Sequence, residues 1–317
     1  MKKVVWGVLS TAKIGVKQVI PAMQLSPWCD MRAIASRSLP AAQAAADALG
    51  VPKAYGSYEE LIADPEIEAI YNPLPNHLHI PLTLQAARAG KHVLCEKPFS
   101  LTAAEAEQLR EVAGRVHIME AFMVRFHPQW QRVRELVRAG RIGTPRAVQV
   151  FFSYFNDDPG NIRNQADIGG GALFDIGCYA IVAGRDLFEA DPARVIALVD
   201  RDPALGTDRT TSALADFGGG RQLGFTVSTQ AQRYQRLNIV GTGGRIEVLI
   251  PFNAPQGEAT TIPVDTTGAL DGSGVERETL QPCDQYTLQG EAFSRAVRAE
   301  VMLPYGLDDA VMNMRII

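Results

Sequence analysis

The sequence of 317 residues predicts two domains, an α/β domain with a parallel sheet followed by an α+β domain with an open, mostly antiparallel sheet. Over the first 121 residues, short apolar runs alternate with helical patterns of about 10–15 residues, as in βαβ units. From residue 122 onward, strand-like runs follow one another with glycine-rich turns between them. The length also suits two domains, since one domain typically holds about 100–200 residues. We therefore expect domains over 1–121 and 122–317.

In the first domain, apolar runs predict strands at Lys3–Leu9, Met31–Ser36, Ala69–Asn72, His92–Cys95 and Val116–Ala121. Helical patterns predict helices at Ile14–Leu25, Pro40–Leu49, Tyr58–Ala63, Leu78–Ala89 and Thr102–Val112. Thr102 and Glu105 have the spacing of a capping box, which supports a helix start at Thr102. Strands that alternate with helices in this way favour a parallel sheet.

In the second domain, Pro145–Phe155 is a long extended run and Ala172–Leu187 a helix. Later strands are expected at Arg194–Val199, Thr210–Phe217, Gln222–Gln230, Arg236–Gly241 and Arg245–Ile250, with glycine turns that indicate an antiparallel meander. We expect a loop over Gly257–Gly274 and a helix over Leu288–Ala299. Arg315–Ile317 continues a helical pattern, so we expect either a truncated end or an abrupt natural one.

Composition excludes several classes of protein. Hydrophobic residues make up 46% and charged residues 21%, and the net charge is −4 with acids and bases interspersed. Nucleic-acid binding and membrane association are therefore not expected, because each usually needs a basic patch. The four cysteines form no CxxC pair, so we expect neither a metal site nor disulfides. Reduced thiols favour a cytoplasmic protein.

The first predicted strand leads directly into Ser10-Thr11-Ala12-Lys13-Ile14-Gly15, which opens the first helix. A Rossmann fold has its G-x-G-x-x-G turn here, where backbone approaches a pyrophosphate at a helix N-terminus. Ser10 and Ala12 replace the first two glycines, and both are small enough for close approach. The alternative is an ordinary strand-to-helix turn.

The second predicted strand ends at Ser36-Arg37-Ser38. NAD enzymes usually have an acidic residue here for the ribose 2′-OH, whereas an arginine can pair with the 2′-phosphate of NADP. Arg37 therefore favours NADP over NAD. The alternative is a solvated surface arginine.

Four motifs resemble the Gfo/Idh/MocA family, the glucose–fructose oxidoreductase and inositol dehydrogenase group. Glu96-Lys97-Pro98 resembles its EKP motif, and Pro73-Leu74-Pro75-Asn76-His77-Leu78-His79 its P-x-x-x-H segment. Residues 169–179, Gly-Gly-Gly-Ala-Leu-Phe-Asp-Ile-Gly-Cys-Tyr, resemble its GGG-A-L-x-D-x-G-x-(H/Y) signature. Glu120-Ala121-Phe122-Met123 with Arg125 also fits. Tyr179 in the last position is similar to the branch of dihydrodiol dehydrogenases and NADP-linked aldose dehydrogenases.

The resemblance implies that Lys97 and Tyr179 form an acid/base pair assisted by Asp175. The residue types suit hydride transfer, which needs a group to handle a hydroxyl proton. The pKa of a free tyrosine is about 10, and a nearby ammonium such as Lys97 favours the phenolate. Asp175 and Tyr179 are four residues apart, so both lie on one helix face. The alternative is a solvated lysine and a packing tyrosine.

Further site residues follow from the same motifs. Pro73, Asn76, His79 and Glu96 are expected to contact the cofactor beside Lys97. Arg125 and Arg163 are candidates for substrate contact, with a structural salt bridge and a surface arginine as their respective alternatives. The aromatic residues of the 145–155 run are expected in the sheet core rather than in a substrate pocket, with at least two facing the core.

We expect an NADP-dependent oxidoreductase that acts on an aldose or cyclic polyol, with its active site between the domains. A trans-dihydrodiol dehydrogenase and a ketosugar or sugar-nucleotide reductase are alternatives, and so is a non-catalytic NADP-binding regulator. The resemblance also implies dimers or tetramers formed through the outer face of the second sheet.

Overall fold

The structure is a computed structural model that describes residues 2–317. The chain divides into two compact units. The first unit contains the chain up to Met123 together with Asp284–Arg315, and the second contains Val124–Cys283 with the last two residues. The division after Met123 lies near the expected boundary at residue 121. The expected second domain, 122–317, differs from this division because Asp284–Arg315 packs in the first unit.

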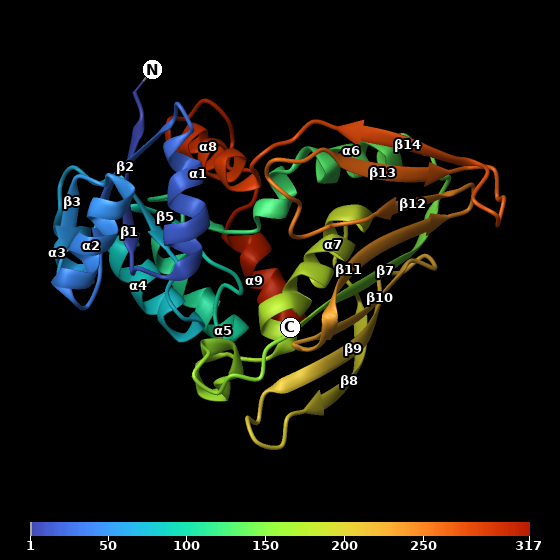
Figure 1. Ribbon diagram of the computed structural model, residues 1–317, viewed down its shortest axis with the longest axis horizontal. Helices are drawn as coiled ribbons and strands as arrows, with labels where there is room; N and C mark the ends of the chain where they lie inside the picture. The colour runs from blue at the N-terminus through green and yellow to red at the C-terminus, as the bar shows by residue number, and fades with distance from the viewer. Residues whose placement is uncertain (1) are drawn as a thin grey trace. The chain divides into compact units, whose positions relative to one another are not determined.

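The sheet of the first unit has six strands in the order β3-β2-β1-β4-β5-β6, and all pairs are parallel. Figure 1 labels β1, β2, β3 and β5 of this sheet. The strands are β1 (Val4–Leu9), β2 (Cys29–Ala35), β3 (Lys53–Tyr55), β4 (Ala69–Asn72), β5 (His92–Cys95) and β6 (Ile118–Glu120). This is the strand order of a dinucleotide-binding Rossmann fold, in which ligands bind where the order reverses, here between β1 and β4. The short β3 is absent from the sequence-based prediction.

Helices alternate with the strands along the first part of this unit, and two more come from the C-terminal segment. They are η1 (Gly15–Val19), α1 (Ile20–Gln24), α2 (Leu39–Leu49), α3 (Tyr58–Ala63), η2 (Asn76–Leu78), α4 (His79–Arg88), α5 (Ala103–Glu107) and η3 (Gln108–Val112), then α8 (Gln285–Val297) and α9 (Leu307–Ile316). The Thr102 hydroxyl accepts from Glu105 N–H at 3.2 Å, which confirms the predicted cap. The predicted helix at Ile14–Leu25 begins with the π-helical turn η1.

Helices cover both faces of this sheet, as adjacent residues of β1 demonstrate. The Trp6 ring packs 5.3 Å from the Phe293 ring of α8. Gly7 faces the opposite side, where a Cβ would lie 2.5 Å from Leu61 Cδ2 of α3. A strand buried on both faces shows no polar alternation, which is why β1 and β4 are almost continuously apolar in sequence.

Contacts with the strands fix the C-terminal segment in the first unit. Trp6 Nε1 donates to Ser294 Oγ at 3.1 Å, and Asn313 Nδ2 donates to Glu120 Oε2 at 2.9 Å. Arg298 pairs with Glu68 at 2.6 Å. These pairs join residues almost two hundred or more positions apart, so no local sequence pattern predicts them.

The sheet of the second unit has eight strands in the order β14-β13-β12-β11-β7-β10-β9-β8. The strands are β7 (Pro145–Phe155), β8 (Arg194–Arg201), β9 (Asp208–Asp216), β10 (Gln222–Ser228), β11 (Gln230–Gly241), β12 (Arg245–Val248), β13 (Thr260–Asp265) and β14 (Val275–Leu280). The β7–β10 pair is parallel and the other pairs are antiparallel. The mostly antiparallel sheet is confirmed, but the simple meander is wrong because β7 inserts between β10 and β11.

The expected loop over Gly257–Gly274 is also wrong in part. It contains β13, which pairs with β12 on one side and with β14 on the other. Ile262 and Val264 of β13 are buried. The surrounding glycines and polar residues obscure this short apolar alternation in the sequence.

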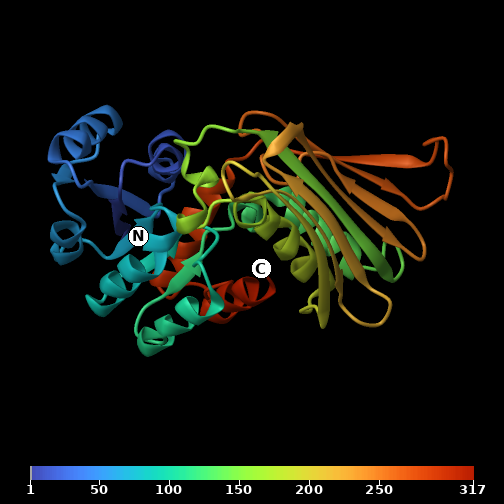
Figure 2. The ribbon, with the colours of Figure 1, turned by 90° about the horizontal axis from the view of Figure 1, so that it is seen from below.

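Helices cover one face of the second sheet, as Figure 2 shows. The longest are α6 (Pro128–Arg138) and α7 (Cys178–Phe188), and the shorter turns are η4 (Met123–Phe126), η5 (Ile162–Asn164), η6 (Ala166–Ile168) and η7 (Leu173–Gly177). By length and composition, the helical stretch Ala166–Phe188 could cross a membrane, but 56% of its most apolar window is buried inside the protein. Such burial is typical of a core helix.

Candidate functional site

The turn after β1 has the geometry of a nucleotide-binding turn. Ser10 has φ 84°, a left-handed conformation that glycine adopts without steric cost. Its hydroxyl accepts from Ala12 N–H at 3.2 Å, which stabilises the turn locally. The first i→i−4 bond of the following helix is Val16 N–H to Ala12 O. The backbone N–H groups of Lys13 and Ile14 come before this bond, in the first turn of the helix. They have no intrahelical acceptor, so they can bind an anion.

The end of β2 presents a charged side chain on a capped turn. Ser36 Oγ accepts from Ser38 N–H, and Ser38 Oγ caps α2 by accepting from Ala41 N–H. Arg37 between them is exposed. Burial raises the pKa of Tyr58, while the charge and hydrogen bond of Arg37 act in the opposite direction. Tyr58 is therefore a neighbour of Arg37 that the sequence analysis does not identify.

The ends of β4 and β5 bring the P-x-x-x-H and EKP motifs together. These strands are parallel neighbours, so Asn72 and Cys95 pair in register just before the two motifs. Tyr71 OH donates to Glu96 Oε1 at 2.6 Å and fixes that carboxylate. Pro73 is buried, whereas Asn76 and Lys97 are partly exposed.

His79 connects these two motifs through its ring. Nδ1 lies 2.8 Å from the Pro98 carbonyl oxygen and Nε2 lies 2.7 Å from the Leu74 carbonyl oxygen. Burial lowers the pKa of His79 to about 4, whereas the two carbonyl oxygens act in the opposite direction, because only the protonated ring donates from both nitrogens. The side chain thus links the loop after β4 to the peptide that follows Lys97.

In the second unit, the glycine run before η7 turns the chain back on itself. Gly170 N–H donates to Gln165 O at 2.9 Å and Gly171 N–H donates to Arg163 O at 2.8 Å. A Cβ on Gly170 would lie 2.6 Å from Arg163 O, and one on Gly171 would lie 1.9 Å from Asp208 Oδ1. Glycine is required at both positions for this close approach, and Gly171 has φ 121°.

The same turn brings together Arg163, Asp175 and Tyr154. Arg163 Nε donates to Asp175 Oδ1 at 3.0 Å, and Tyr154 OH donates to Asp175 Oδ2 at 2.6 Å. Burial, and then the adjacent carboxylate, raise the pKa of Tyr154, so its phenol remains a donor. Tyr154 is a further residue that the sequence analysis does not identify as part of a site.

Tyr179 lies one turn beyond Asp175, at the start of α7. Its ring packs 5.3 Å from the ring of Phe252 and 6.1 Å from that of Phe152. The Phe252 ring also stacks on Trp130 at 6.1 Å. Aromatic neighbours of this kind restrict the orientation of the ring. The π-helical turn η7, a feature frequent at functional sites, holds Asp175.

The aromatic residues of β7 divide between the two faces of the sheet. Phe152 is buried and Tyr154 faces Asp175, whereas Phe151 and Phe155 are exposed. Two of the four therefore face the helices, as predicted, but Tyr154 makes a polar contact with a candidate site residue rather than belonging to an apolar core.

Arg125 makes a buried ion pair. Its Nε donates to Asp186 Oδ2 at 3.0 Å, and only 2% of its side chain is exposed. Of the two alternatives weighed from the sequence, the geometry favours the structural salt bridge over substrate contact. The paired guanidinium avoids the large cost of an uncompensated buried charge.

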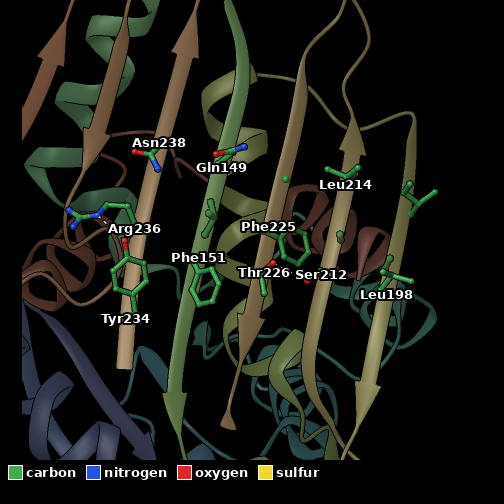
Figure 3. A pocket seen from close by; sticks show the side chains of 15 residues that line it. Gln149, Phe151, Leu198, Ser212, Leu214, Phe225, Thr226, Tyr234, Arg236 and Asn238 are labelled. Atoms are coloured by element: carbon green, nitrogen blue, oxygen red, sulfur yellow. Dashed lines mark hydrogen bonds between the residues drawn. The ribbon is translucent and has the colours of Figure 1, made fainter. Parts of the chain in front are cut away.

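The outer face of the second sheet carries a groove of about 820 Å³ (Figure 3). Figure 3 shows side chains from β7 to β11 lining it, including Phe151, Leu198, Leu214 and Tyr234. Leu198 is 81% exposed and Leu214 53% exposed. We call this surface the outer face. Ser212 Oγ and Thr226 Oγ1 hydrogen-bond within it at 2.9 Å.

Comparisons with known proteins cover both units. The family described as "Oxidoreductase family, NAD-binding Rossmann fold" matches residues 4–125, and the "GFO/IDH/MocA C-terminal domain" matches residues 130–247. The chain is 45% identical over 320 residues to an uncharacterized oxidoreductase of Rhizobium meliloti, covering 100% of this chain and 96% of that protein. It is 41% identical to D-xylose 1-dehydrogenase (NADP(+)) 2 of Haloferax volcanii, covering 98% and 94%.

More distant relatives have related activities. Trans-1,2-dihydrobenzene-1,2-diol dehydrogenase of Xenopus laevis is 33% identical, covering 77% of this chain and 74% of that protein. Among solved structures, a 3-ketoreductase from Actinomadura kijaniata in complex with NADP and TDP-benzene has a TM-score of 0.91 at 28% identity, covering 99% of this chain and 95% of that chain. The matches at both units, in the predicted order, show that the chain belongs to the GFO/IDH/MocA oxidoreductase family, with an NAD-binding Rossmann fold.

Proposed function

We propose that this protein transfers hydride between NADP(H) and a CH–OH carbon of an aldose or cyclic polyol. The observation that carries this proposal is the 41% identity to a D-xylose 1-dehydrogenase (NADP(+)) over 98% of the chain. Arg37 at the end of β2 supports NADP, because its exposed guanidinium suits a 2′-phosphate. The alternative cofactor is NAD.

The residues around the strand ends of the first unit are proposed to hold the cofactor. The turn after β1 would bind the pyrophosphate, the Ser36–Ser38 turn the 2′-phosphate, and the β4 and β5 ends the nicotinamide half. The proposed residues are Ser10, Thr11, Ala12, Lys13, Ile14, Ser36, Arg37, Ser38, Pro73, Asn76, His79, Glu96 and Lys97. When bound, NADP+ supplies the hydride acceptor.

Tyr179 is proposed as the group that accepts the substrate hydroxyl proton as the C–H bond is broken. We propose Lys97 as the partner whose ammonium would favour the phenolate form of Tyr179, with Asp175 as the assisting carboxylate. In the reverse reaction, Tyr179 returns the proton to the carbonyl oxygen of the substrate. The aromatic neighbours of Tyr179 restrict the rotation of its side chain. A fixed orientation suits a group that must accept the proton of one particular hydroxyl.

The experiment that tests this function is a substrate panel with NADP+ and NAD+ side by side, followed by absorbance of the reduced nicotinamide. We expect the highest kcat/KM with an aldose and NADP+. A preference for trans-dihydrodiols, or for reduction of ketosugars, would select one of the enzymatic alternatives. Binding of NADPH without turnover of any substrate would instead favour a non-catalytic regulator.

The outer face is proposed to bind a second copy of this chain. Ile196, Leu198 and Leu214 expose apolar surface on adjacent strands, and contiguous exposed apolar surface favours an interface. A two-fold arrangement buries the same residues from both copies. Leu214→Asp should convert a dimer or tetramer into a smaller species in light scattering, whereas Leu270→Asp, at another exposed leucine, should not.

The compartment is proposed from the cysteines. Within residues 2–317, Cys29, Cys95, Cys178 and Cys283 form no disulfide, and three of them are buried. Reduced thiols suit the reducing cytoplasm.

A further inference from the structure

The carboxylate of Asp175 organises a polar array in the second unit. Its two oxygens accept from Arg163 Nε at 3.0 Å and from Tyr154 OH at 2.6 Å. The two terminal nitrogens of Arg163 make no hydrogen bond to residues 2–317. The Arg163 side chain is 44% exposed, so these donors are accessible.

The backbone on both sides of Arg163 is fixed. Arg163 N–H donates to Asn161 Oδ1 at 3.1 Å, and Arg163 O accepts from Gly171 N–H at 2.8 Å. Asn164 is buried, and its Nδ2 donates to Asp158 O at 2.8 Å. A surface arginine that is merely solvated needs none of these constraints. The glycine run therefore serves to hold the Arg163 segment against η7.

The Arg163 charge is also within electrostatic reach of Tyr179. The adjacent Asp175 is the main cause of a raised pKa for Arg163, and Tyr154 and Tyr179 contribute in the same direction against the effect of burial. Arg163 also bonds to Asp175, and Tyr179 lies one turn beyond Asp175 on the same helical stretch, so the three side chains belong to one local group. If a substrate hydroxyl bonds to Tyr179, the substrate atoms next to that hydroxyl lie near Arg163.

We propose that Arg163 binds two adjacent hydroxyls of the substrate through its two terminal nitrogens, and that Asp175 and Tyr154 are positioning residues for its guanidinium. This inference rests on the proposed function, which brings the substrate to Tyr179. A planar guanidinium offers two parallel donors, a geometry that matches neighbouring oxygens. Asp175 already neutralises the charge of Arg163, which favours neutral hydroxyl oxygens over an anionic group as the ligand.

The test compares an aldopentose that the wild type oxidises with its monodeoxy analogues. In the wild type, removing a hydroxyl that Arg163 binds should lower kcat/KM on the order of tenfold, because the guanidinium donor loses its acceptor in the complex. Arg163→Lys keeps the charge but loses the paired donors. We expect this variant to raise KM for the parent sugar more than it lowers kcat, and to remove most of the discrimination between parent and deoxy analogues.

Arg209→Lys is the matched control, since Arg209 Nε also donates to an aspartate, Asp200, at a side-chain exposure of 38%. It should leave the discrimination unchanged. Arg163→Gln serves as a second variant, and NADPH affinity checks that each variant is folded. Tyr154→Phe should weaken discrimination in the wild-type background and have no further effect in Arg163→Lys, because Tyr154 acts through the same guanidinium.

The outcomes separate this inference from the proposed function. A wild type that turns over no hydroxylated substrate overturns the proposed function and this inference with it. An active wild type whose deoxy discrimination persists in both Arg163 variants overturns this inference alone. A preference for a sugar bearing a carboxylate, lost in Arg163→Lys, also overturns it, because the ligand of Arg163 would then be an anion.

Discussion

The six-stranded and eight-stranded sheets bury their side chains in different ways. In the first unit, Trp6 and Gly7 face opposite sides of β1 and both meet helices. In the second unit, Val150 of β7 is buried while the adjacent Phe151 is 39% exposed. The first sheet is thus a two-sided core with the proposed cofactor site at its strand ends. The second sheet has helices on one face only, and its other face is the one that we propose binds a second copy.

The largest stability effect is expected in the core of the first unit. Trp6→Ala removes the contact with Phe293 and the hydrogen bond to Ser294, so it should lower the free energy of unfolding by about 3–5 kcal/mol. Urea denaturation measures this. A decrease in the free energy of unfolding of less than about 1 kcal/mol would contradict the conclusion that the C-terminal segment packs as part of this core.

A smaller effect is expected at the glycine turn of the second unit. Gly171→Ala would bring a Cβ to 1.9 Å from Asp208 Oδ1 at a φ of 121°. We expect a loss of about 2–4 kcal/mol in the free energy of unfolding. Gly268→Ala is the control, because Gly268 has φ 73° with no atom within 4 Å of a Cβ. Equal losses in both variants would show that the left-handed backbone alone, without the close approach to Asp208, accounts for the need for glycine at position 171.

The smallest effect concerns the ion pair that anchors the C-terminal segment to the first sheet. Burial alone would raise the pKa of Glu68, but Arg298, Val5 N–H and Lys2 outweigh it and lower the pKa from 4.5 to about 2. A lowered folded-state pKa means that Glu68 stabilises the protein above pH 4.5 and loses this contribution as the pH falls toward 2.

Glu68→Gln should therefore cost about 1–3 kcal/mol at pH 7 and make the loss of stability below pH 4.5 less steep than in the wild type. Urea denaturation at a series of pH values measures both effects. Parallel pH profiles for the two proteins would mean that Glu68 contributes nothing through its charge.

The sequence predicts local elements well where their own residues determine them. The bounds of β4, β5 and β7 match the predicted runs, because each is an uninterrupted apolar or extended segment. The position of β7 between β10 and β11 does not follow from any local pattern. The same holds for Asp284–Arg315, whose contacts with Trp6, Glu68 and Glu120 are made across most of the chain.

The candidate site shows the same limit. Lys97, Asp175 and Tyr179 lie in recognisable motifs, so the sequence identifies them as candidates. Tyr154 lies in no such motif, and its contact with Asp175 depends on how β7 packs against η7. Arg125 lies in a motif, yet its guanidinium is buried against Asp186, a partner that only the folded chain reveals.

The most direct test of the proposed function is the Tyr179→Phe variant, assayed for turnover of the preferred sugar and for NADPH affinity. Removing the group that accepts the proton should lower kcat by about 10²–10⁴-fold and leave NADPH affinity within about twofold. Tyr234→Phe, on the outer face, should retain wild-type turnover. Near-wild-type turnover by Tyr179→Phe would contradict proton transfer through Tyr179 and the account built on it.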